Sequence, residues 1–85
     1  MFDELALLEA LTRKRVELMR EIAHCKPSSI RDLAEALDRD VKNVWQDLSI
    51  LEDFGLVGFK QKGRTKRPFI TRQVIVTTIQ VVYHE

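Results

Sequence analysis

The chain has few of the side chains on which redox, metal and hydrolytic sites depend. Its 85 residues include one cysteine and two histidines, so no intramolecular disulfide can form. Cys25, His24 and His84 are also too few for a metal-ligand set. No Ser/His/Asp constellation or Gly-rich phosphate loop occurs, so we predict that the protein is not an enzyme and holds no cofactor and no metal. Because free cysteine is often buried, we expect Cys25 to be a partly buried apolar residue; a metal or redox sensor is the alternative.

Long hydrophobic runs are also missing. The longest apolar stretch, residues 74–83, is interrupted by polar residues and is far shorter than the roughly 20 residues of a membrane-spanning helix. The N-terminal apolar stretch contains Asp3, Glu4 and Glu9, which a secretory signal would not. We therefore expect a soluble, cytoplasmic protein with no membrane partner.

The positive charge is concentrated in one short segment. The net charge is only +1, but residues 1–59 carry eight Lys/Arg against twelve Asp/Glu. Residues 60–72, KQKGRTKRPFITR, carry six basic residues and no acidic one. This local asymmetry makes nucleic acid or another polyanion a candidate partner, but only for the basic segment.

Apolar residues recur at three- and four-residue steps in stretches that we predict to be helices. These stretches are residues 2–11, 13–25, 30–37 and 41–54. Thr12, Ser29 and Asp40 precede the last three and are suitable N-caps, whereas Pro27 and Gly55 mark helix ends. In the last stretch, the stripe predicted to be buried is Val41, Val44, Leu48 and Leu51.

After Gly55 the apolar period changes from that of a helix to that of a strand. LVGFKQK (56–62) and FIT (69–71) indicate the strands of a hairpin, with turn residues in KGRTKRP (62–68). VIVTTIQVVY (74–83) is predicted to be a further strand from its β-branched content. The order of elements predicts one α+β domain over 1–85. It is a winged helix-turn-helix with an extra N-terminal helix and a C-terminal strand.

The helix predicted at 41–54 is the candidate for DNA recognition, because the second helix of a helix-turn-helix enters the major groove. Outside its apolar stripe, the candidate base-reading residues are Lys42, Asn43, Trp45, Gln46 and Ser49. Asn and Gln can bond bidentately to adenine, and Lys can reach guanine or a phosphate. The alternative is the polar face that any amphipathic helix has. Trp45 either contacts a sugar or thymine methyl or packs on the hairpin.

The basic segment is predicted to be the wing, whose cations would neutralise phosphates and release counterions. The residues expected on the DNA backbone are Lys60, Lys62, Lys66 and Arg67, with Ser28 and Ser29 at a helix N-terminus. Arg64, beside Gly63, is expected to reach furthest, into the minor groove. The alternative is a solvated hairpin whose Lys and Pro only protect its exposed edges.

Three carboxylates lie near this proposed DNA-binding face and would repel phosphates. Asp40 is accounted for as a helix cap, and we expect Asp47 to pair with Arg39 or Arg31. The sequence suggests no role for Asp38.

The stretch SIRDLAEALDRDVKNVWQDLSILEDFGLV, residues 29–57, resembles the core of MarR/ArsR-type winged-helix transcriptional regulators. It is most similar to small archaeal predicted regulators, in which such a run precedes a GR.KRP wing, and the likeness covers about 12–72. The resemblance implies homodimeric binding to a pseudo-palindromic operator, usually as a repressor. It places Lys42, Asn43, Trp45, Gln46 and Ser49 at groove-facing positions and Arg64, Lys66 and Arg67 in the wing. The Cys/His clusters of metal sensors and the long flanking helices of full-length MarR proteins are lacking, so we expect no sensing by those routes.

Residues that exceed the needs of one winged helix indicate a homodimer. They are the helix at 2–11, the strand at 73–83 and Ile50, which we expect to be exposed. Two-fold symmetry would then place half-sites about 10–10.5 bp apart. One alternative is a protein-interaction adaptor in a transcription or replication assembly, which the acidic residues around 38–53 favour. RNA binding is a third reading, against which the lack of an aromatic stacking platform counts.

Overall fold

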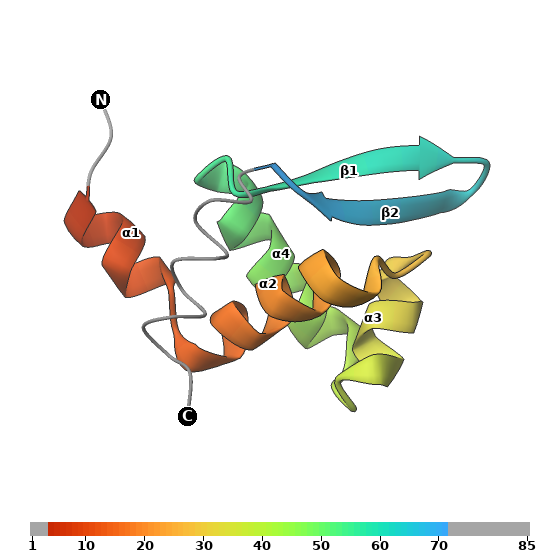
Figure 1. The fold of residues 1–85 in the computed structure, drawn as a ribbon, viewed down its shortest axis with the longest axis horizontal. Helices are drawn as coiled ribbons and strands as arrows, with labels where there is room; N and C mark the ends of the chain where they lie inside the picture. Colours follow the sequence, from red (N-terminus) through yellow and green to blue (C-terminus); the bar gives the residue numbers. More distant parts are fainter. Residues whose placement is uncertain (1–3, 72–85) are drawn as a thin grey trace.

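The computed structural model describes residues 4–71, and the strand predicted at 74–83 lies outside the described residues. Its elements, in order, are α1 (Glu4–Ala10), α2 (Arg13–Cys25), α3 (Ile30–Ala36), α4 (Val41–Asp53), β1 (Val57–Lys62) and β2 (Thr65–Ile70). Figure 1 shows α2, α3 and α4 grouped together, with the β1–β2 hairpin along one side and α1 at the end away from the hairpin tip. The predicted winged helix-turn-helix is confirmed, with α3 and α4 as its helix pair.

The core lies between α2, α3 and α4, and the start of the hairpin closes it. Its buried side chains are Val16, Leu18, Met19, Ile22, Ile30, Leu33, Ala34, Val44, Leu48, Leu51, Leu56 and Val57. The predicted stripe on α4 is confirmed at three of its four positions. Val41 is the exception: it is 36% exposed, because it begins the helix beside the exposed turn that precedes it.

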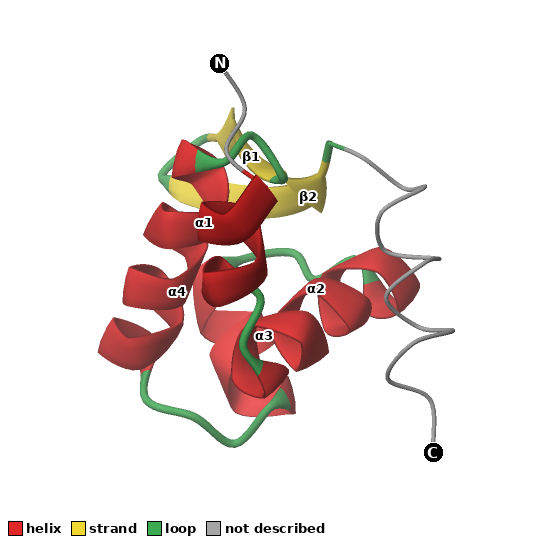
Figure 2. Ribbon diagram, turned by 90° about the vertical axis from the view of Figure 1, so that its left-hand side faces the viewer, coloured by secondary structure: helices red, strands yellow, loops and turns green. Residues whose placement is uncertain are grey.

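The orientation of α1 differs from the predicted one. Leu7 and Leu11 pack against the core and Ala10 is buried, whereas Leu5 is 71% and Leu8 66% exposed. The apolar pattern of residues 2–11 predicts a face of Leu5, Leu8 and Leu11 that Ala6, Leu7 and Ala10 widen. Because that face covers more than half of the circumference, several orientations of α1 fit the pattern, and the observed one turns the Leu7, Ala10 and Leu11 side inward. Figure 2 views the molecule from the α1 end, where α1 lies in front of the other helices.

Local hydrogen bonds begin α2 and α3 where the sequence predicts. The Thr12 hydroxyl accepts from the Arg15 backbone N–H at 3.3 Å, and the Ser29 hydroxyl accepts from that of Asp32 at 3.0 Å. Asp40 occupies the N-cap position of α4 with extended backbone, but its side chain makes no capping hydrogen bond. Asp40 is therefore a cap by position only, and its carboxylate is exposed.

The ends of α3 and α4 show what Asp38 does. Asp38 has a φ of 52°, its N–H donates to the Glu35 carbonyl at 3.1 Å, and the N–H of Arg39 donates to that of Ala34 at 2.9 Å. These are the two bonds of a Schellman motif, which requires left-handed backbone just past the helix. Aspartate tolerates that conformation better than most residues, so Asp38 occupies a place that glycine often fills. Gly55, at φ 72°, ends α4 in the same way.

The hairpin is tighter than the sequence suggested. Lys62 pairs with Thr65, so the turn consists of Gly63 and Arg64 alone. The residues TKRP (65–68), predicted as part of the turn, belong to β2. Gly63 has a φ of 62° and Arg64 is not at positive φ, the pattern of a type II′ turn with glycine first.

Asp47 on α4 connects three parts of the chain. Its carboxylate accepts from Arg15 Nε on α2 at 3.0 Å and from Arg39 Nη2 in the turn before α4 at 2.7 Å. All three side chains are mostly buried, at 14–21% exposed. The predicted pairing with Arg39 is confirmed, and Arg15 takes the place proposed for Arg31. The sequence could not indicate Arg15, since it lies 32 residues away.

We predict that Asp47→Asn destabilises the fold by about 2 kcal/mol, because it leaves two mostly buried guanidinium groups without their counterion. Urea unfolding measures this loss. Glu17→Gln is the control, since the Arg13–Glu17 pair is 71% and 51% exposed and such pairs contribute less than about 1 kcal/mol. Equal losses in the two variants would contradict the structural role of Asp47.

Candidate nucleic-acid interface

An open groove of about 450 Å³ lies where α3, α4 and the hairpin tip meet. Its lining residues are Ser29, Ile30, Arg31, Trp45, Gln61, Arg64, Thr65 and Lys66; we call it the wing groove. Three of these residues are cationic and none is acidic. The groove thus brings together Ser29, Trp45, Arg64 and Lys66, which the sequence predicted as DNA contacts on separate elements.

Aromatic packing beside this groove holds the hairpin against α4. The rings of Trp45 and Phe59 lie 5.4 Å apart between centroids at an angle of 49°, a tilted geometry that aromatic pairs favour. Lys66 Nζ lies 5.4 Å from the Trp45 centroid and 6.0 Å from that of Phe59, within the range of cation–π attraction. Of the readings left open for Trp45, packing on the hairpin is the one observed. Trp45 also remains 36% exposed to the groove.

Strand alternation divides the basic residues of the hairpin between its two faces. Phe59 pairs with Pro68 and Gln61 with Lys66, so these four side chains share the face that carries the Trp45 contact. Lys60 pairs with Arg67 and Lys62 with Thr65, so Lys60, Lys62 and Arg67 lie on the opposite face because successive residues alternate. Thr65, next to the tip, still borders the wing groove. Of the six basic residues in 60–72, the five that the structure describes therefore do not form one surface: Arg64 and Lys66 line the wing groove, whereas Lys60, Lys62 and Arg67 do not. The sixth, Arg72, lies outside the described residues.

The outer face of the hairpin has an aromatic contact of its own. Phe69 lies opposite Gly58, where a Cβ would come within 2.7 Å of its ring. Lys60 Nζ lies 5.4 Å from the Phe69 centroid. Arg67 is half-buried and lines a smaller groove of about 150 Å³ with Lys26 at the end of α2.

The other flank of α4 borders a second open groove, of about 490 Å³. Its lining residues are Thr12, Arg13, Lys14, Arg15, Arg39, Asn43, Gln46 and Asp47; we call it the α2 groove. Asn43 and Gln46 therefore face the start of α2 and not the wing. Sequence reasoning missed this basic cluster, although RKR at 13–15, directly after the Thr12 cap, was a readable signal.

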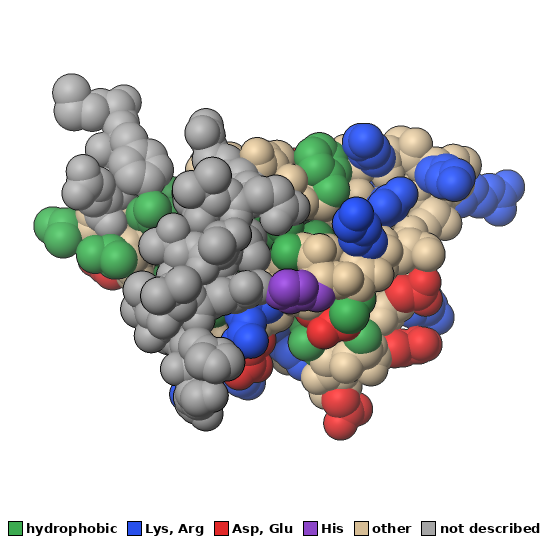
Figure 3. All heavy atoms as spheres, viewed as in Figure 1, with side chains coloured by type: hydrophobic (Ala, Val, Ile, Leu, Met, Phe, Trp, Pro, Cys, Tyr) green, Lys and Arg blue, Asp and Glu red, His purple; other side chains and the backbone are tan. Residues whose placement is uncertain are grey.

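The remaining predicted contacts lie outside these two grooves. Lys42 and Ser49 on α4 are exposed, as are Ser28, Lys60 and Lys62. Figure 3 shows Lys and Arg side chains along the hairpin and its tip, and Asp and Glu side chains over the region of α3.

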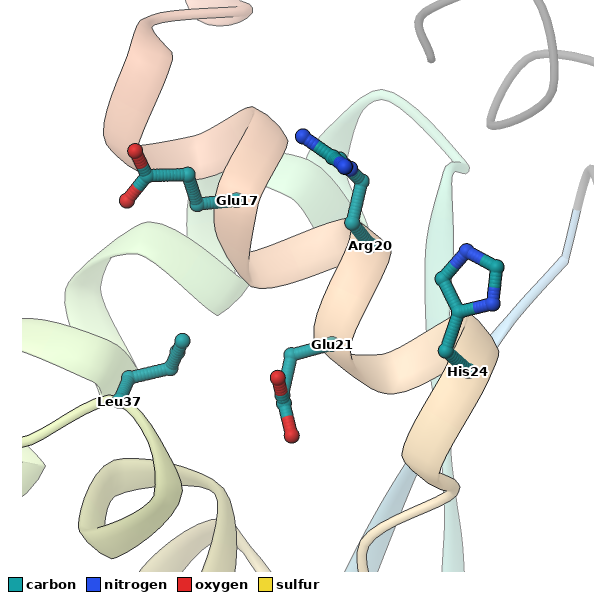
Figure 4. A pocket seen from close by; sticks show the side chains of 5 residues that line it. All are labelled: Glu17, Arg20, Glu21, His24 and Leu37. Carbon is teal, nitrogen blue, oxygen red and sulfur yellow. The ribbon is translucent and has the colours of Figure 1, made fainter. Parts of the chain in front are cut away.

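A further groove, of about 300 Å³, is lined by side chains of mixed charge. Glu17, Arg20, Glu21 and His24 of α2 line it with Leu37 from the turn after α3 (Figure 4). Within residues 4–71, no group of three His, Cys, Asp or Glu side chains could hold a metal ion. No helix in that same range is long and apolar enough to cross a membrane.

Cys25, predicted to be partly buried, is exposed, because the last turn of α2 directs it away from the core. A hydrogen bond with Glu21 raises the pKa of the Cys25 thiol above its ordinary value. A raised pKa favours the neutral thiol over the reactive thiolate.

A comparison with protein families identifies the family of this chain. The model of the HVO_A0114 family matches residues 10–77. The chain belongs to the HVO_A0114 family. No curated protein matches this member of the family by sequence.

Solved structures share the fold of this HVO_A0114 family member at low sequence identity. A predicted DNA-binding transcriptional regulator from E. coli is 22% identical, with a TM-score of 0.77 over 93% of this chain and 87% of that one. The antimony-specific transcriptional repressor AntR is 18% identical, with a TM-score of 0.78 over 92% and 71%. The homodimeric winged helix-turn-helix DNA-binding domain of Mb0332 from Mycobacterium bovis, a possible ArsR-family regulator, is 19% identical, with a TM-score of 0.75 over 100% and 92%. The predicted resemblance to winged-helix regulators is thus confirmed at the level of the fold.

We predict that Trp45→Ala loosens the hairpin without unfolding the helices. Loss of the ring contacts should raise hydrogen exchange of the β1 and β2 amides about tenfold, because aromatic and cation–π contacts together contribute about 1–2 kcal/mol. Exchange in α2 should stay unchanged. Val41→Ala is the matched control, since Val41 and Trp45 are both 36% exposed on the same helix. Similar hairpin exchange in both variants would show that Trp45 does not hold the wing.

Proposed function

We propose that this protein is a sequence-specific double-stranded DNA-binding transcriptional regulator. In this proposal α4 enters the major groove and the hairpin tip lies on the adjacent backbone or in the minor groove. The observation that carries the proposal is the wing groove, where Trp45 of α4 and Arg64 and Lys66 of the hairpin line one open, cationic surface. A duplex could contact both elements at once only if they share such a surface.

Each part of the surface has a distinct proposed role. Lys42, Asn43, Gln46 and Ser49 read base edges, since amide and ammonium groups match adenine and guanine in the major groove. Arg64 at the type II′ turn extends furthest and is suited to a narrow minor groove. Lys66 and Ser29 contact phosphates beside Trp45. Lys60, Lys62 and Arg67 lie outside the wing groove and act on the backbone through the wider positive field. Ser28 is neutral and exposed, and its hydroxyl donates a hydrogen bond to a phosphate at the N-terminal end of α3.

The similar structures support this reading. The E. coli protein is a predicted DNA-binding transcriptional regulator, AntR is a repressor, and the M. bovis domain is a homodimer that belongs to a possible ArsR-family regulator. We infer that this protein is a homodimeric repressor that binds a two-fold operator. Leu8 supports a dimer contact through α1, because this leucine is 66% exposed. Ile50, predicted to be exposed, is half-buried and contributes less to that argument.

We predict that Lys66→Ala weakens binding to any duplex by about fivefold and lowers the slope of log K against log salt by about 0.9, the effect of one lost phosphate contact. Fluorescence anisotropy over a salt series measures both quantities. Lys60→Ala is the matched control: each lysine lies 5.4 Å from an aromatic centroid, but on opposite faces of the hairpin. The control should change affinity by less than about twofold.

Equal effects of the two substitutions would show that the wing groove is not part of the DNA-binding surface. If the wild-type protein bound no duplex, or bound it without salt dependence, the proposal itself would fail. The protein-interaction adaptor would then be the better reading.

We predict that Gln46→Ala relaxes recognition at a single base-pair position. A bidentate amide–adenine contact discriminates by about 1–3 kcal/mol, so sequences selected from random DNA by this variant should lose preference at one position in each half-site. Lys66→Ala should leave the selected sequence unchanged. A Gln46→Ala selection identical to that of the wild type would exclude Gln46 from base reading.

A further inference from the structure

The α2 groove is cationic and lies on the opposite flank of α4 from the wing. Asn43 and Gln46 line it from α4, whereas Trp45 lines the wing groove. Four of its eight lining residues are Lys or Arg, and one is a carboxylate. Two open grooves with an excess of positive charge therefore border the two flanks of α4.

The single carboxylate of the α2 groove is already engaged. Asp47 accepts from Arg15 with one oxygen and from Arg39 with the other, so two guanidinium groups outweigh it. Arg15 is fixed further by donating from Nη1 to the Ala10 carbonyl at 3.1 Å. Arg39 Nη1 is buried and has no hydrogen-bond partner among the described residues. The ion pairs thus hold two cations in place and leave a positive surface.

Lys14 adds an exposed cation to the two guanidinium groups of Arg15 and Arg39. It is exposed in the first turn of α2 and lines the same groove. Further along the helix the charge is mixed, because Glu17 and Glu21 accompany Arg20 in the groove of Figure 4. Positive charge is therefore concentrated at the end of α2 that borders α4.

The dimensions of DNA suggest what this second groove binds. The major groove is about 12 Å wide, and a helix with its side chains is about 10–12 Å across. A helix that enters the major groove therefore has a phosphate backbone against each of its flanks. The wing groove accounts for one of these backbones and leaves the other without a cationic contact.

We propose that the α2 groove is a second phosphate-binding surface, which holds the DNA strand on the far side of the major groove from the hairpin. The inference rests on the proposed DNA-binding function and extends it. Lys14 contacts a phosphate directly, while Arg15 and Arg39 present fixed positive charge beside it. Asn43 and Gln46 then lie between this strand and the base edges, which fixes their register for base reading.

The test compares Lys14→Gln with Arg20→Gln in the full chain. Each substitution removes one positive charge from α2, but Arg20 lies about 9 Å further along the helix, a distance over which salt screens most of the effect. The duplex is one selected from random DNA by the wild-type protein. We expect Lys14→Gln to raise Kd about fivefold and to lower the salt slope by about 0.9. Arg20→Gln should change Kd by less than about twofold.

Methylphosphonate substitution of single phosphates locates the contact. Neutralising the phosphate that Lys14 contacts should weaken the wild-type complex but not the Lys14→Gln complex. Neutralising the phosphate that Lys66 contacts should likewise weaken the wild-type complex but not the Lys66→Ala complex. The two phosphates should lie on opposite sides of the major groove. Circular dichroism of the Lys14→Gln and Arg20→Gln variants is the folding control, and we expect spectra equal to that of the wild type.

The outcomes separate this inference from the function on which it rests. If Lys66→Ala weakens binding while Lys14→Gln and Arg20→Gln behave alike, the second phosphate surface is wrong and DNA binding through the wing stands. If the two substitutions abolish the effect of methylphosphonate at the same phosphate, the α2 groove and the wing groove do not bind opposite sides of the major groove, and the inference is wrong. If neither lysine affects duplex binding, both phosphate-binding surfaces are wrong. The DNA-binding function itself fails only if the wild-type protein binds no duplex or binds it without salt dependence.

Discussion

A tilted pair of aromatic rings, Trp45 of α4 and Phe59 of β1, joins the helix to the hairpin. Lys66 lies over both rings, so the same contact that positions the hairpin also positions a cation beside α4. A two-stranded hairpin is marginally stable by itself and depends on such packing for its direction. The base of the hairpin is fixed by Val57 and Pro68, which are buried, and the ring pair holds the part nearer the tip against α4, so that helix and wing present one surface.

The distribution of charge depends on backbone geometry as much as on composition. Strand alternation assigns Lys66 to the α4 side of the hairpin and Lys60 to the other. On the opposite flank of α4, the Asp47 carboxylate, which alone would repel a phosphate, binds Arg15 and Arg39. The three side chains together therefore carry a net positive charge. A nearly neutral chain can thus present local positive surfaces on either side of one helix.

Features governed by local sequence could be predicted, and features governed by tertiary context could not. Thr12 and Ser29 cap the helices as expected, because a capping bond joins residues three apart. Contacts over long sequence distances, such as that of Arg15 with Asp47, leave no local signal. The division of the basic wing residues also depended on register, which follows from a turn of two residues. The apolar pattern of α1 did not determine which of its faces packs on the core, and Leu8 is exposed in the structure.

The most direct test of the account is backbone amide NMR of the labelled protein during titration with a duplex selected from random DNA. The account predicts that the largest shift changes fall on the first half of α4, on the hairpin tip from Gly63 to Lys66, and around Ser29 and Lys14. Changes concentrated instead around Glu17, Arg20 and Glu21 of α2, with none on α4 or at the tip, would contradict it.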